Sequence, residues 1–533
     1  MTTFETIIRG GTVVDGTTSE PVITDVGINV DSIAALGDLS SSNARTEIDA
    51  NGLHVSPGFI DAHGHSDYTL LADGRAFSQV SQGVTTEVIG NCGHGCAPIV
   101  GDPEGFTGNI YGYTGNPELS WYTFGEYLDR LQAAGPAINA VPLVPHGNLR
   151  ISSMADRSKP VTRAEAETMK RHMDEAFDEG AWGLSFGLEY GSERSASFDE
   201  LSALSRLTAE RDGLLAVHTR NKETLAVEAV NEAIQLGRAA DSAVQVSHII
   251  PRLGGSPDDL EKIINSINSS ASTGMDIAFD IHTRLHGITH LSDALFPDMT
   301  QESADEIRQA LDSESTRQAL SKRECLISSF ALGGWDRITV YTSPMQPDLA
   351  GRTIADLAAE WRLGDWDAVF KVLSINAEDI HGPLVICHSY EEADVISTAL
   401  QDLCLIGSDA TALCKDGPLA GETFLGAYSW AGWTFSRLTG DSGNLSVARA
   451  IRKLTGSAAD RFGLADRGYV ATGKKADIVV FNPGEFVEVA DLNEPNRPCE
   501  GVRDVLVNGV LTLSNGRQIS QSGGRVLRKG SVN

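Results

Sequence analysis

The sequence predicts an α/β protein: a (β/α)8 TIM barrel joined to a small β-sandwich domain that both chain termini build together. Three observations predict this fold. Short apolar runs alternate with helix-like segments, eight such runs occupy the middle of the chain, and the two ends contain short strands separated by turn residues. Strand, helix and strand in series form a parallel sheet, and eight such units close a barrel.

Residues 1–57 are expected to form the N-terminal part of the sandwich. Runs such as "TIIRGGTVVDG" and "DVGINVDSIAALG" are β-branched and are separated by Gly, Asn and Asp, which favour turns. Residues 470–533 repeat this pattern in "GKKADIVVFNP" and "VRDVLVNGVLTLSNG". We therefore expect the two terminal segments to meet in one small domain.

The barrel is expected to span residues 58–469. Amphipathic stretches such as "TRAEAETMKRHMDEAFDEG" separate its strands and carry apolar residues at helical spacing. In this fold the carboxyl ends of the strands carry the chemistry. The predicted strands are "GFIDAHGH" (58–65), "GVTTEVIGNC" (83–92), "NAVPLVPHGN" (139–148), "GAWGLSFGLEY" (180–190), "GLLAVHTRN" (213–221), "SAVQVSHII" (242–250), "MDIAFDIH" (275–282) and "LCLIGSDA" (403–410).

A long segment, residues 283–402, separates the seventh predicted strand from the eighth. It is rich in helical pattern and is much longer than an ordinary connection. An insertion at this point would sit above the barrel mouth and could act as a lid.

The chain is strongly acidic, with 72 acidic and 42 basic side chains and a formal charge of −30. Such a charge repels nucleic acid and anionic membrane surfaces. No apolar run approaches the roughly 20 residues that cross a bilayer, and the first residues lack the pattern of a signal peptide. We expect a cytoplasmic protein without nucleic-acid or membrane partners, whereas a homo-oligomer is compatible with the sequence.

The chain contains seven cysteines. An odd number spread over a long chain argues against a disulfide framework and for reduced thiols, of which one or two could bind a metal.

Two histidines, His63 and His65, end the first predicted strand. Residues i and i+2 of a strand point to the same side, so the two imidazoles project together and could chelate one ion. Taken alone, the pair is a weak motif that is better explained as two solvated histidines. His218, His248 and Asp409 end three further predicted strands. Closing the barrel would bring these residues together, and together they match the ligand preferences of zinc-type ions.

In combination these motifs resemble those of the amidohydrolase superfamily, and within it those of the N-acyl-D-amino-acid deacylases (D-aminoacylases). The resemblance runs nearly from end to end of the chain. The motifs that carry it are "GFIDAHGHSD", "IGNCGHGCAP", "GLSFGLEY", "VHTRN", "VSH", "PDLAGRTIADLAAE", "GSDA" and "LTGSAADRFGLADRGYVATGKKADIVVFNP".

The resemblance implies one or two divalent metal ions, Zn²⁺ above all. His63 and His65 would hold one ion, while Cys92, His218 and His248 would hold the other more tightly. Many superfamily members bridge two metals with a carbamylated lysine, but "GLSFGLEYGS" has no lysine. Cys92 would take that role, since a metal-bound cysteine is a thiolate that adds negative charge.

The resemblance also implies the reaction, hydrolysis of a C–N amide bond in a small molecule. Asp409, which also belongs to the metal-ligating set, would be the general base: it would take a proton from a metal-activated water and pass it to the leaving amine. Metal binding lowers the pKa of water from 15.7 to about 7, so no serine nucleophile is required. Tyr190 matches a substrate-contacting tyrosine of the deacylases.

The sequence departs from the family where the family binds the substrate's carboxylate. Ile250 stands where the deacylases have a lysine, and the loop after Asp409, "GSDATALCKDGPLAGETF", lacks their arginine. After the seventh strand, "HTR" replaces a tyrosine-rich segment and places His282 and Arg284 near the mouth. Either a relocated cation binds the carboxylate, or the substrate has none. The candidate cations are Arg284, Arg252 and Lys415.

Three functions remain open. The first is an N-acyl-(D-)amino-acid deacylase, or a close relative that acts on a less polar amide. The second is a hydrolase of cyclic amides, ureas or carbamates with the same metal site. The third is a non-catalytic binding protein on the same scaffold. His146 and Glu189 also end predicted strands, where polar residues often support the ligands or are solvated. His94 is expected to be a loop histidine, and Cys96 a small buried thiol.

Overall fold

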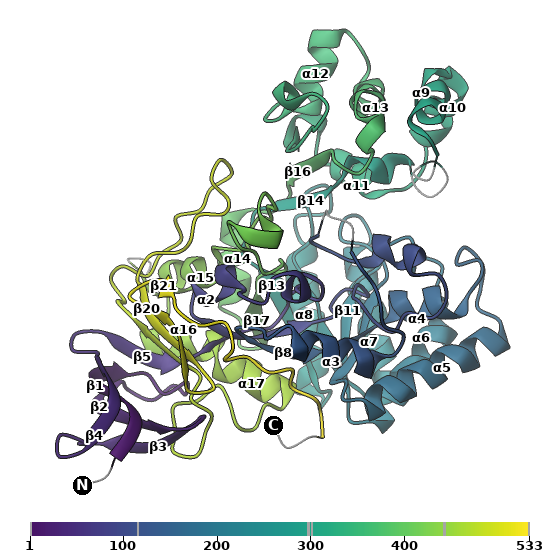
Figure 1. The fold of residues 1–533 in the computed structure, drawn as a ribbon. Coiled ribbons are helices and arrows are strands. Elements are labelled where there is room, and N and C mark those ends of the chain that lie inside the picture. Colours follow the sequence, from purple (N-terminus) through teal and green to yellow (C-terminus); the bar gives the residue numbers. More distant parts are fainter. Residues whose placement is uncertain (1–2, 114–116, 296–298, 300–301, 441–443, 531–533) are drawn as a thin grey trace.

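The computed structural model describes residues 3–113, 117–295, 299, 302–440 and 444–530. A central body of parallel strands is surrounded by helices, strands from both termini lie at one side of it, and a mostly helical insertion projects from it (Figure 1). No helix in the described ranges is long and apolar enough to cross a membrane. All seven cysteines are buried free thiols.

The central strands form two parallel sheets. Each of the eight predicted segments contains at least one of these strands, and the third contains two, so the strand predictions are confirmed. The three-stranded sheet has the order β6-β7-β8, and the six-stranded sheet has the order β17-β13-β12-β11-β10-β9. Their bounds are β6 (Phe59–Asp61), β7 (Val84–Ile89), β8 (Asn139–Pro142), β9 (Val144–Pro145), β10 (Gly183–Gly187), β11 (Leu214–His218), β12 (Ala243–Val246), β13 (Ile277–His282) and β17 (Cys404–Gly407).

The two parallel sheets approach each other at both edges. On one side, only Leu143 separates β8 from β9, so one continuous stretch of chain contributes a strand to each sheet. On the other side, the ends of β6 and β17 exchange backbone hydrogen bonds: Asp409 N–H donates to the His63 carbonyl and His65 N–H to the Ala410 carbonyl, each at 2.8 Å. The second contact brings the two predicted ligand motifs "HGH" and "GSDA" side by side.

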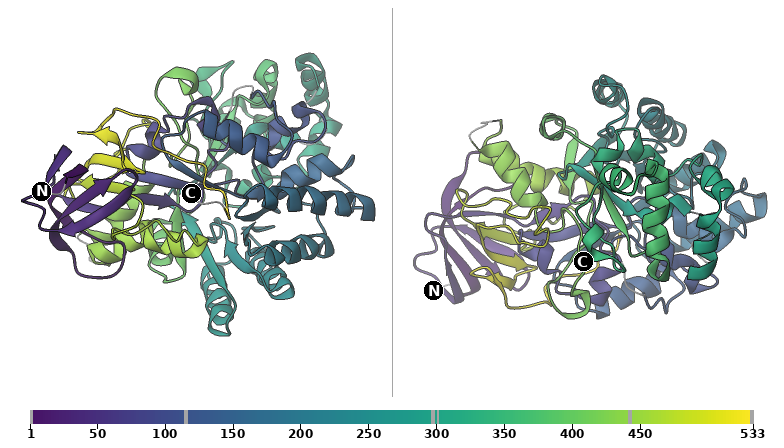
Figure 2. Two further views of the ribbon diagram at one scale, coloured as in Figure 1. Left: turned by 60° about the horizontal axis from the view of Figure 1, so that its bottom comes forward. Right: turned by 90° about the horizontal axis from the view of Figure 1, so that it is seen from above.

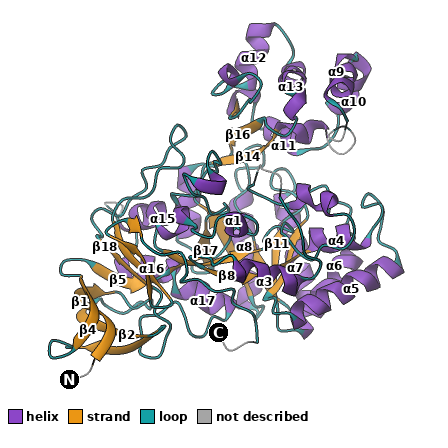
Figure 3. Ribbon diagram, viewed as in Figure 1, coloured by secondary structure: helices purple, strands orange, loops and turns teal. Residues whose placement is uncertain are grey.

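Helices cover the outside of these strands (Figure 3). The stretch predicted as a helix at 162–180 forms α5, whose first turn is held by a capping box between Thr162 and Glu165. Its buried residues are Met169, Met173, Ala176 and Phe177, at the spacing of one helical face. The helices of this body are α1 (Thr69–Ala72), α2 (Phe77–Val80), α3 (Phe124–Ala133), α4 (His146–Ser153), α5 (Arg163–Asp178), α6 (Phe198–Glu210), α7 (Ala226–Ala240), α8 (Asp259–Ser272), α14 (Glu392–Ala399), α15 (Trp430–Thr439), α16 (Val447–Leu454) and α17 (Gly456–Phe462).

The two ends of the chain meet in one nine-stranded sheet, which Figure 2 shows as purple and yellow strands lying together. The junction is the antiparallel pair of β5 and β18, which runs from Ile478 opposite Pro57 to Phe481 opposite His54. The sheet encloses its own apolar cluster. Its strands are β1 (Thr3–Val13), β2 (Val22–Asn29), β3 (Ser32–Gly37), β4 (Asn43–Asp49), β5 (His54–Pro57), β18 (Ile478–Phe481), β19 (Val502–Val507), β20 (Val510–Ser514) and β21 (Arg517–Gln518).

A buried polar network ties this terminal sheet to the parallel strands. Asp477 precedes β18, forms an ion pair with Arg467 and accepts a hydrogen bond from the backbone of Asn508 at 2.6 Å. It also accepts from Nδ2 of Asn139, the first residue of β8, at 3.2 Å. The aspartate of "GKKADIVVFNP" therefore has a structural role at the junction of the two regions.

The insertion between β13 and β17 has its own apolar cluster. An antiparallel sheet of order β14-β16-β15 connects it to the body, and Leu253 N–H donates to the Ser389 carbonyl at 2.9 Å. A role as a lid stays a prediction. Its elements are β14 (His286–His290), α9 (Ala304–Asp312), α10 (Glu314–Leu320), α11 (Leu326–Ala331), β15 (Ile338–Val340), α12 (Ile354–Trp361), α13 (Asp365–Ile375) and β16 (Leu384–His388).

Candidate metal centre

Two groups of potential metal ligands lie at the carboxyl ends of the parallel strands. The first contains His63, His65, Cys92 and Asp409, and the second contains Cys92, His218 and His248. Within each group the ligand atoms lie within 4.8 Å of one another, and every member is buried. The predicted ligands are thus brought together from β6, β7, β11, β12 and β17, and Cys92 belongs to both groups.

The spacing of these atoms fits a small divalent ion. Sγ of Cys92 lies 3.2 Å from Nε2 of His63 and 3.4 Å from Nε2 of His248. Oδ1 of Asp409 lies 3.1 Å from Nε2 of His65 and 3.6 Å from Nε2 of His63. Ligands that surround one zinc ion at its usual bond lengths are about 3–4 Å apart. Thiolate, imidazole and carboxylate are also the donors that zinc prefers.

The electrostatics of the two groups also favour binding of a divalent cation. Burial raises the pKa of the Cys92 thiol, but the neighbouring imidazoles, that of His63 above all, outweigh it and hold the pKa well below its usual range. The pKa of His65, which burial lowers, is raised to about 9 by Asp409 and Cys92. The two buried anions, Cys92 and Asp409, thus favour the protonated form of His65. A divalent cation would supply the same positive charge.

The backbone is strained at three of the candidate ligands. Cys92, His248 and Asp409 have φ values of 54°, 35° and 44°, in a region that residues other than glycine rarely adopt. Each such residue costs roughly 1–3 kcal/mol, and strain of this kind concentrates at functional sites. Gly93 follows Cys92 with φ of 69°, and a Cβ there would overlap the Glu193 carboxylate.

A carboxylate that the sequence analysis did not single out orients both groups. Oδ1 of Asp280, on β13, lies 3.1 Å from Nδ1 of His63 and accepts the backbone N–H of His248 at 2.8 Å. Oδ2 accepts from Nε2 of Gln245 at 3.0 Å. The sequence does contain a signal for this residue: Asp280 stands two residues before His282 and so points to the same side of its strand.

Lys222 is a second residue that sequence reasoning missed. It lies in the loop between β11 and α7, is buried, and places Nζ 3.1 Å from Nδ1 of His248. Its cationic charge helps burial to lower the pKa of His248 to about 4. A neutral imidazole is the form that binds a metal.

Glu189 and His146 lie outside both groups of potential ligands, and neither is solvated. Oε2 of Glu189 lies 2.9 Å from Nε2 of His218, and the same carboxylate is held by Arg252. His146 lies between Glu193 and Glu200, at 2.6 and 3.1 Å. Glu189 therefore supports a candidate ligand, while His146 is part of a neighbouring buried ion-pair network.

Most of the predicted substrate residues lie close to the groups. The Tyr190 hydroxyl is 3.5 Å from Nδ1 of His218. Nε2 of His282 is 4.0 Å from Oδ2 of Asp409, and Arg284 forms an ion pair with the same oxygen. Ile250 instead packs in the apolar cluster of the body.

The supporting residues His94 and Cys96 are both buried. His94, predicted in a loop, does lie in the loop after β7 and packs against Tyr190 with ring centroids 4.3 Å apart. Burial lowers the pKa of His94 to about 4. Burial also raises the pKa of the Cys96 thiol well above its usual range, as expected for a small buried thiol.

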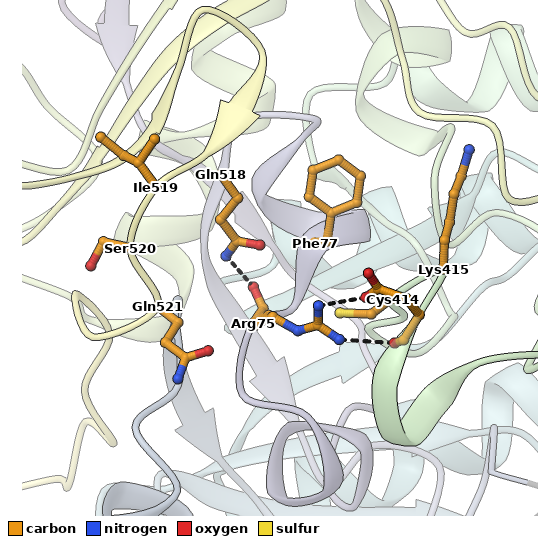
Figure 4. A pocket seen from close by; sticks show the side chains of 9 residues that line it. Arg75, Phe77, Cys414, Lys415, Gln518, Ile519, Ser520 and Gln521 are labelled. Carbon is orange, nitrogen blue, oxygen red and sulfur yellow. Dashed lines mark hydrogen bonds and ion pairs between the residues drawn. The ribbon is translucent and has the colours of Figure 1, made fainter.

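Lys415 lies away from both groups. Its side chain is exposed and lines a cavity of about 420 Å³ between the loop after β17 and the chain around β21 (Figure 4). Arg75 lines the same cavity and is paired with Asp73 and Asp416. No candidate metal ligand is among the residues that line this cavity.

Comparison with known proteins agrees with this arrangement. The amidohydrolase family model matches residues 46–308 and 404–513. The D-aminoacylase of Alcaligenes xylosoxydans xylosoxydans is 30% identical over 534 residues, which cover 99% of this chain and 98% of the relative. A crystal structure of D-aminoacylase superimposes with a TM-score of 0.82 at 29% identity, over 99% of this chain and all of that one.

A further solved structure, the N-acyl-D-glutamate deacylase of Bordetella bronchiseptica, contains zinc and a phosphonate inhibitor that mimics the tetrahedral intermediate. It matches with a TM-score of 0.81 and 28% identity over 99% of this chain and 100% of its own. The chain therefore belongs to the amidohydrolase family. Within the family it is similar over nearly its whole length to the D-aminoacylases, so the resemblance predicted from the motifs is confirmed.

Proposed function

We propose that this protein is a zinc-dependent amidohydrolase that cleaves the amide bond of an N-acyl amino acid. The observation that carries the proposal is the position of Cys92, whose sulfur lies within reach of His63 on one side and His248 on the other. Cys92 thereby joins two groups of buried ligands into one centre. The names and contents of the relatives, D-aminoacylase and a zinc-containing N-acyl-D-glutamate deacylase, support the same reaction.

The residues of the centre divide into ligands and a base. His63 and His65 would hold one ion, and Cys92, His218 and His248 the other. A bound zinc ion supplies Lewis-acid chemistry, lowering the pKa of water and polarising a carbonyl. The chain's own residues then have to move one proton from that water to the leaving amine.

Asp409 fits the role of the proton carrier. Burial would raise its pKa, but Arg284 and His65 hold the pKa well below its usual range, so the carboxylate is ionised. Arg284 occupies Oδ2, while Oδ1 faces Nε2 of His65 at 3.1 Å. Oδ1 would accept the proton and release it to the amine nitrogen.

The Asp280 carboxylate would hold the ring of His63, and Glu189 that of His218. Hydrogen bonds of this kind fix the orientation of a ligating histidine. His282 borders the base, and burial together with Arg284 lowers its pKa well below the usual range. It would therefore be neutral beside Asp409.

A second candidate is a hydrolase of cyclic amides, ureas or carbamates with the same metal centre. Two cations that were expected to bind a substrate carboxylate are instead paired within the protein, which favours this candidate. Arg284 is paired with Asp409, and Arg252 with Glu189 and Glu223. Ile250 offers no charge. A neutral substrate would need none of them.

The proposal also covers the barrel, the terminal sandwich and the insertion. We infer that the two parallel sheets, which contact each other at both edges, close into a (β/α)8 barrel over residues 58–469. Residues 1–57 and 470–533 would form the appended sandwich, and residues 283–402 the insertion above the mouth. A cytoplasmic location, a small-molecule substrate and the absence of nucleic-acid partners fit the charge of −30.

The test is turnover across a panel of N-acyl-D- and N-acyl-L-amino acids, hydantoins, aryl amides and ureas, on protein whose metal content has been measured. The proposal predicts turnover of N-acyl amino acids that chelation abolishes and added zinc restores. Turnover of neutral compounds alone would favour the second candidate. Metal-loaded protein without turnover of any compound would favour a binding protein. Asp409→Asn should abolish turnover while the protein still binds metal.

A further inference from the structure

We propose that the Lys222 ammonium and the Tyr390 hydroxyl form the binding position for the free carboxylate of the substrate. This inference rests on the proposed function, since it concerns an acylated amino acid. Lys222 is contributed by the loop after β11, and Tyr390 by the end of the insertion, two residues beyond β16. The position thus combines the body of the protein with the insertion.

Lys222 is a buried cation beside the metal centre. It is 4% exposed, compared with 7% for Asp409, so the two side chains are similarly sheltered. Nζ lies 3.1 Å from Nδ1 of His248 and 3.3 Å from the Tyr390 hydroxyl. Among the described residues, no carboxylate oxygen lies within 4.0 Å of this ammonium.

Two other cations near the centre, Arg252 and Arg284, are already paired with carboxylates. Arg252 contacts Glu189 and Glu223, and Arg284 contacts Asp409. Their positive charges are therefore balanced by carboxylates of the protein itself. Lys222 differs from both: among the described residues, the side chains that its ammonium contacts, His248 and Tyr390, carry no negative charge.

The orientation of His248 leaves Lys222 short of acceptors. Nε2 of His248 faces the Cys92 sulfur at 3.4 Å, and a ring that binds a metal through Nε2 carries its proton on Nδ1. That nitrogen then cannot accept a hydrogen bond from Lys222. An ammonium has three donors and no acceptor, and a buried charge without a partner is costly. A substrate carboxylate would supply the missing acceptor.

Hydrogen bonds to the backbone of its loop fix the position of Lys222. The Lys222 carbonyl accepts the N–H of Arg252 at 2.7 Å. The Asn221 side chain before it accepts the N–H groups of Glu223 and Leu225, each at 2.9 Å. The Tyr390 ring packs against His282, with ring centroids 4.9 Å apart.

The position also lies close to the candidate metal ligands. Lys222 and Cys92 contact the two different nitrogens of one imidazole, that of His248. An anion at Lys222 is therefore separated from the metal centre by the width of a single ring. This short spacing favours a carboxylate carried on the carbon next to the amide nitrogen, as in an N-acyl amino acid.

The experiment compares two matched substrates, N-acetyl-D-leucine and N-acetyl-D-leucinamide, which differ in the charge of one group. Lys222→Met removes the ammonium and Tyr390→Phe the hydroxyl, on zinc-loaded protein. Lys415→Met is the matched control, because it removes an exposed cation that lines a separate cavity, whose lining residues include none of the candidate ligands. Loss of a buried charge partner costs 2 kcal/mol or more, that is about 30-fold. The ratio of kcat/KM for the acid to that for the amide should therefore fall about 30-fold in Lys222→Met and less in Tyr390→Phe, and it should not change in Lys415→Met.

Two readouts besides turnover complete the test. Zinc content should be the same in Lys222→Met and in the wild-type protein. Calorimetric binding of D-leucine should weaken in the variant by a larger factor than binding of D-leucinamide. Equal losses for acid and amide, or loss of zinc from the variant, would overturn the inference and make Lys222 a support for His248. If the wild-type protein hydrolyses neither substrate and binds no zinc, the proposed function fails instead.

Discussion

The Asp280 carboxylate lies 3.1 Å from Nδ1 of His63, and the other nitrogen of that ring lies 3.2 Å from the Cys92 sulfur. The same carboxylate oxygen accepts the backbone N–H of His248. One side chain on β13 thereby orients a ligand from each of the two groups. Partners of this kind tune the affinity of the metal as well as the direction of the ring.

Replacement of this carboxylate should weaken metal binding. In Asp280→Asn the negative charge behind His63 is lost, and we expect metal affinity to fall about 10–100-fold. Competition with a chromogenic chelator measures this affinity. Asp276→Asn is the control, since Asp276 is an exposed residue just before the same strand. Equal affinity in the Asp280 variant and the wild type would contradict the assigned role.

Gly93 should not tolerate a side chain. Gly93→Ala would place a methyl group against Glu193 and 2.8 Å from the Gly187 nitrogen, directly beside Cys92. Gly463→Ala is a matched control, because Gly463 has nearly the same φ, 68° against 69°, and nothing within 4 Å of the added atom. The control should cost about 1–2 kcal/mol of unfolding free energy, because alanine is disfavoured at positive φ. Gly93→Ala should cost clearly more and should reduce metal content; equal effects of the two variants would refute this reading.

The junction between the terminal sheet and the parallel strands depends on Asp477. Asp477→Ala leaves the buried Arg467 guanidinium without its main partner, which costs about 3–5 kcal/mol. Asp466→Ala removes a partly exposed carboxylate that lies 3.5 Å from the same guanidinium. That loss should cost at most about 1 kcal/mol. Urea unfolding followed by fluorescence compares the two variants, and a similar loss in both would contradict the role of the junction.

The His146 network should make stability depend on pH. Burial alone would lower the pKa of His146, but Glu193 and Glu200 raise it above its usual value. A raised pKa in the folded state contributes stability that is fully present below the unfolded pKa, about 6.5, and is lost as the pH rises through the folded value. The stability difference between wild type and His146→Asn should therefore be largest near pH 6 and shrink at higher pH. Urea titrations at several pH values measure it; a difference that grows with pH would have the wrong sign.

Much of the candidate site was predictable because its signals are local. Alternating strands and helices can be read from residue spacing, and strand ends collect at one edge of a parallel sheet. His63, His65, His218, His248 and Asp409 follow from that rule alone. Cys92 needed the resemblance to the deacylases, since a buried cysteine has no distinguishing local pattern.

The pairing of charges could not be predicted in this way. Arg252 is neutralised by Glu189 and Glu223, residues 63 and 29 positions away in the chain. Which cation remains available to a substrate depends on these long-range contacts. The sequence therefore suggested Arg284, Arg252 and Lys415, whereas the structure draws attention to Lys222.

The central claim is that Cys92 joins two groups of ligands into one metal centre. The most direct measurement is the zinc content of the wild type, Cys92→Ala and Cys96→Ala after dialysis against a weak chelator. Cys96 is a buried thiol outside both groups and serves as the control. The account predicts one or two ions per chain in the wild type and in Cys96→Ala, and a loss of at least one in Cys92→Ala. Equal zinc content in all three proteins, or none in the wild type, would contradict it.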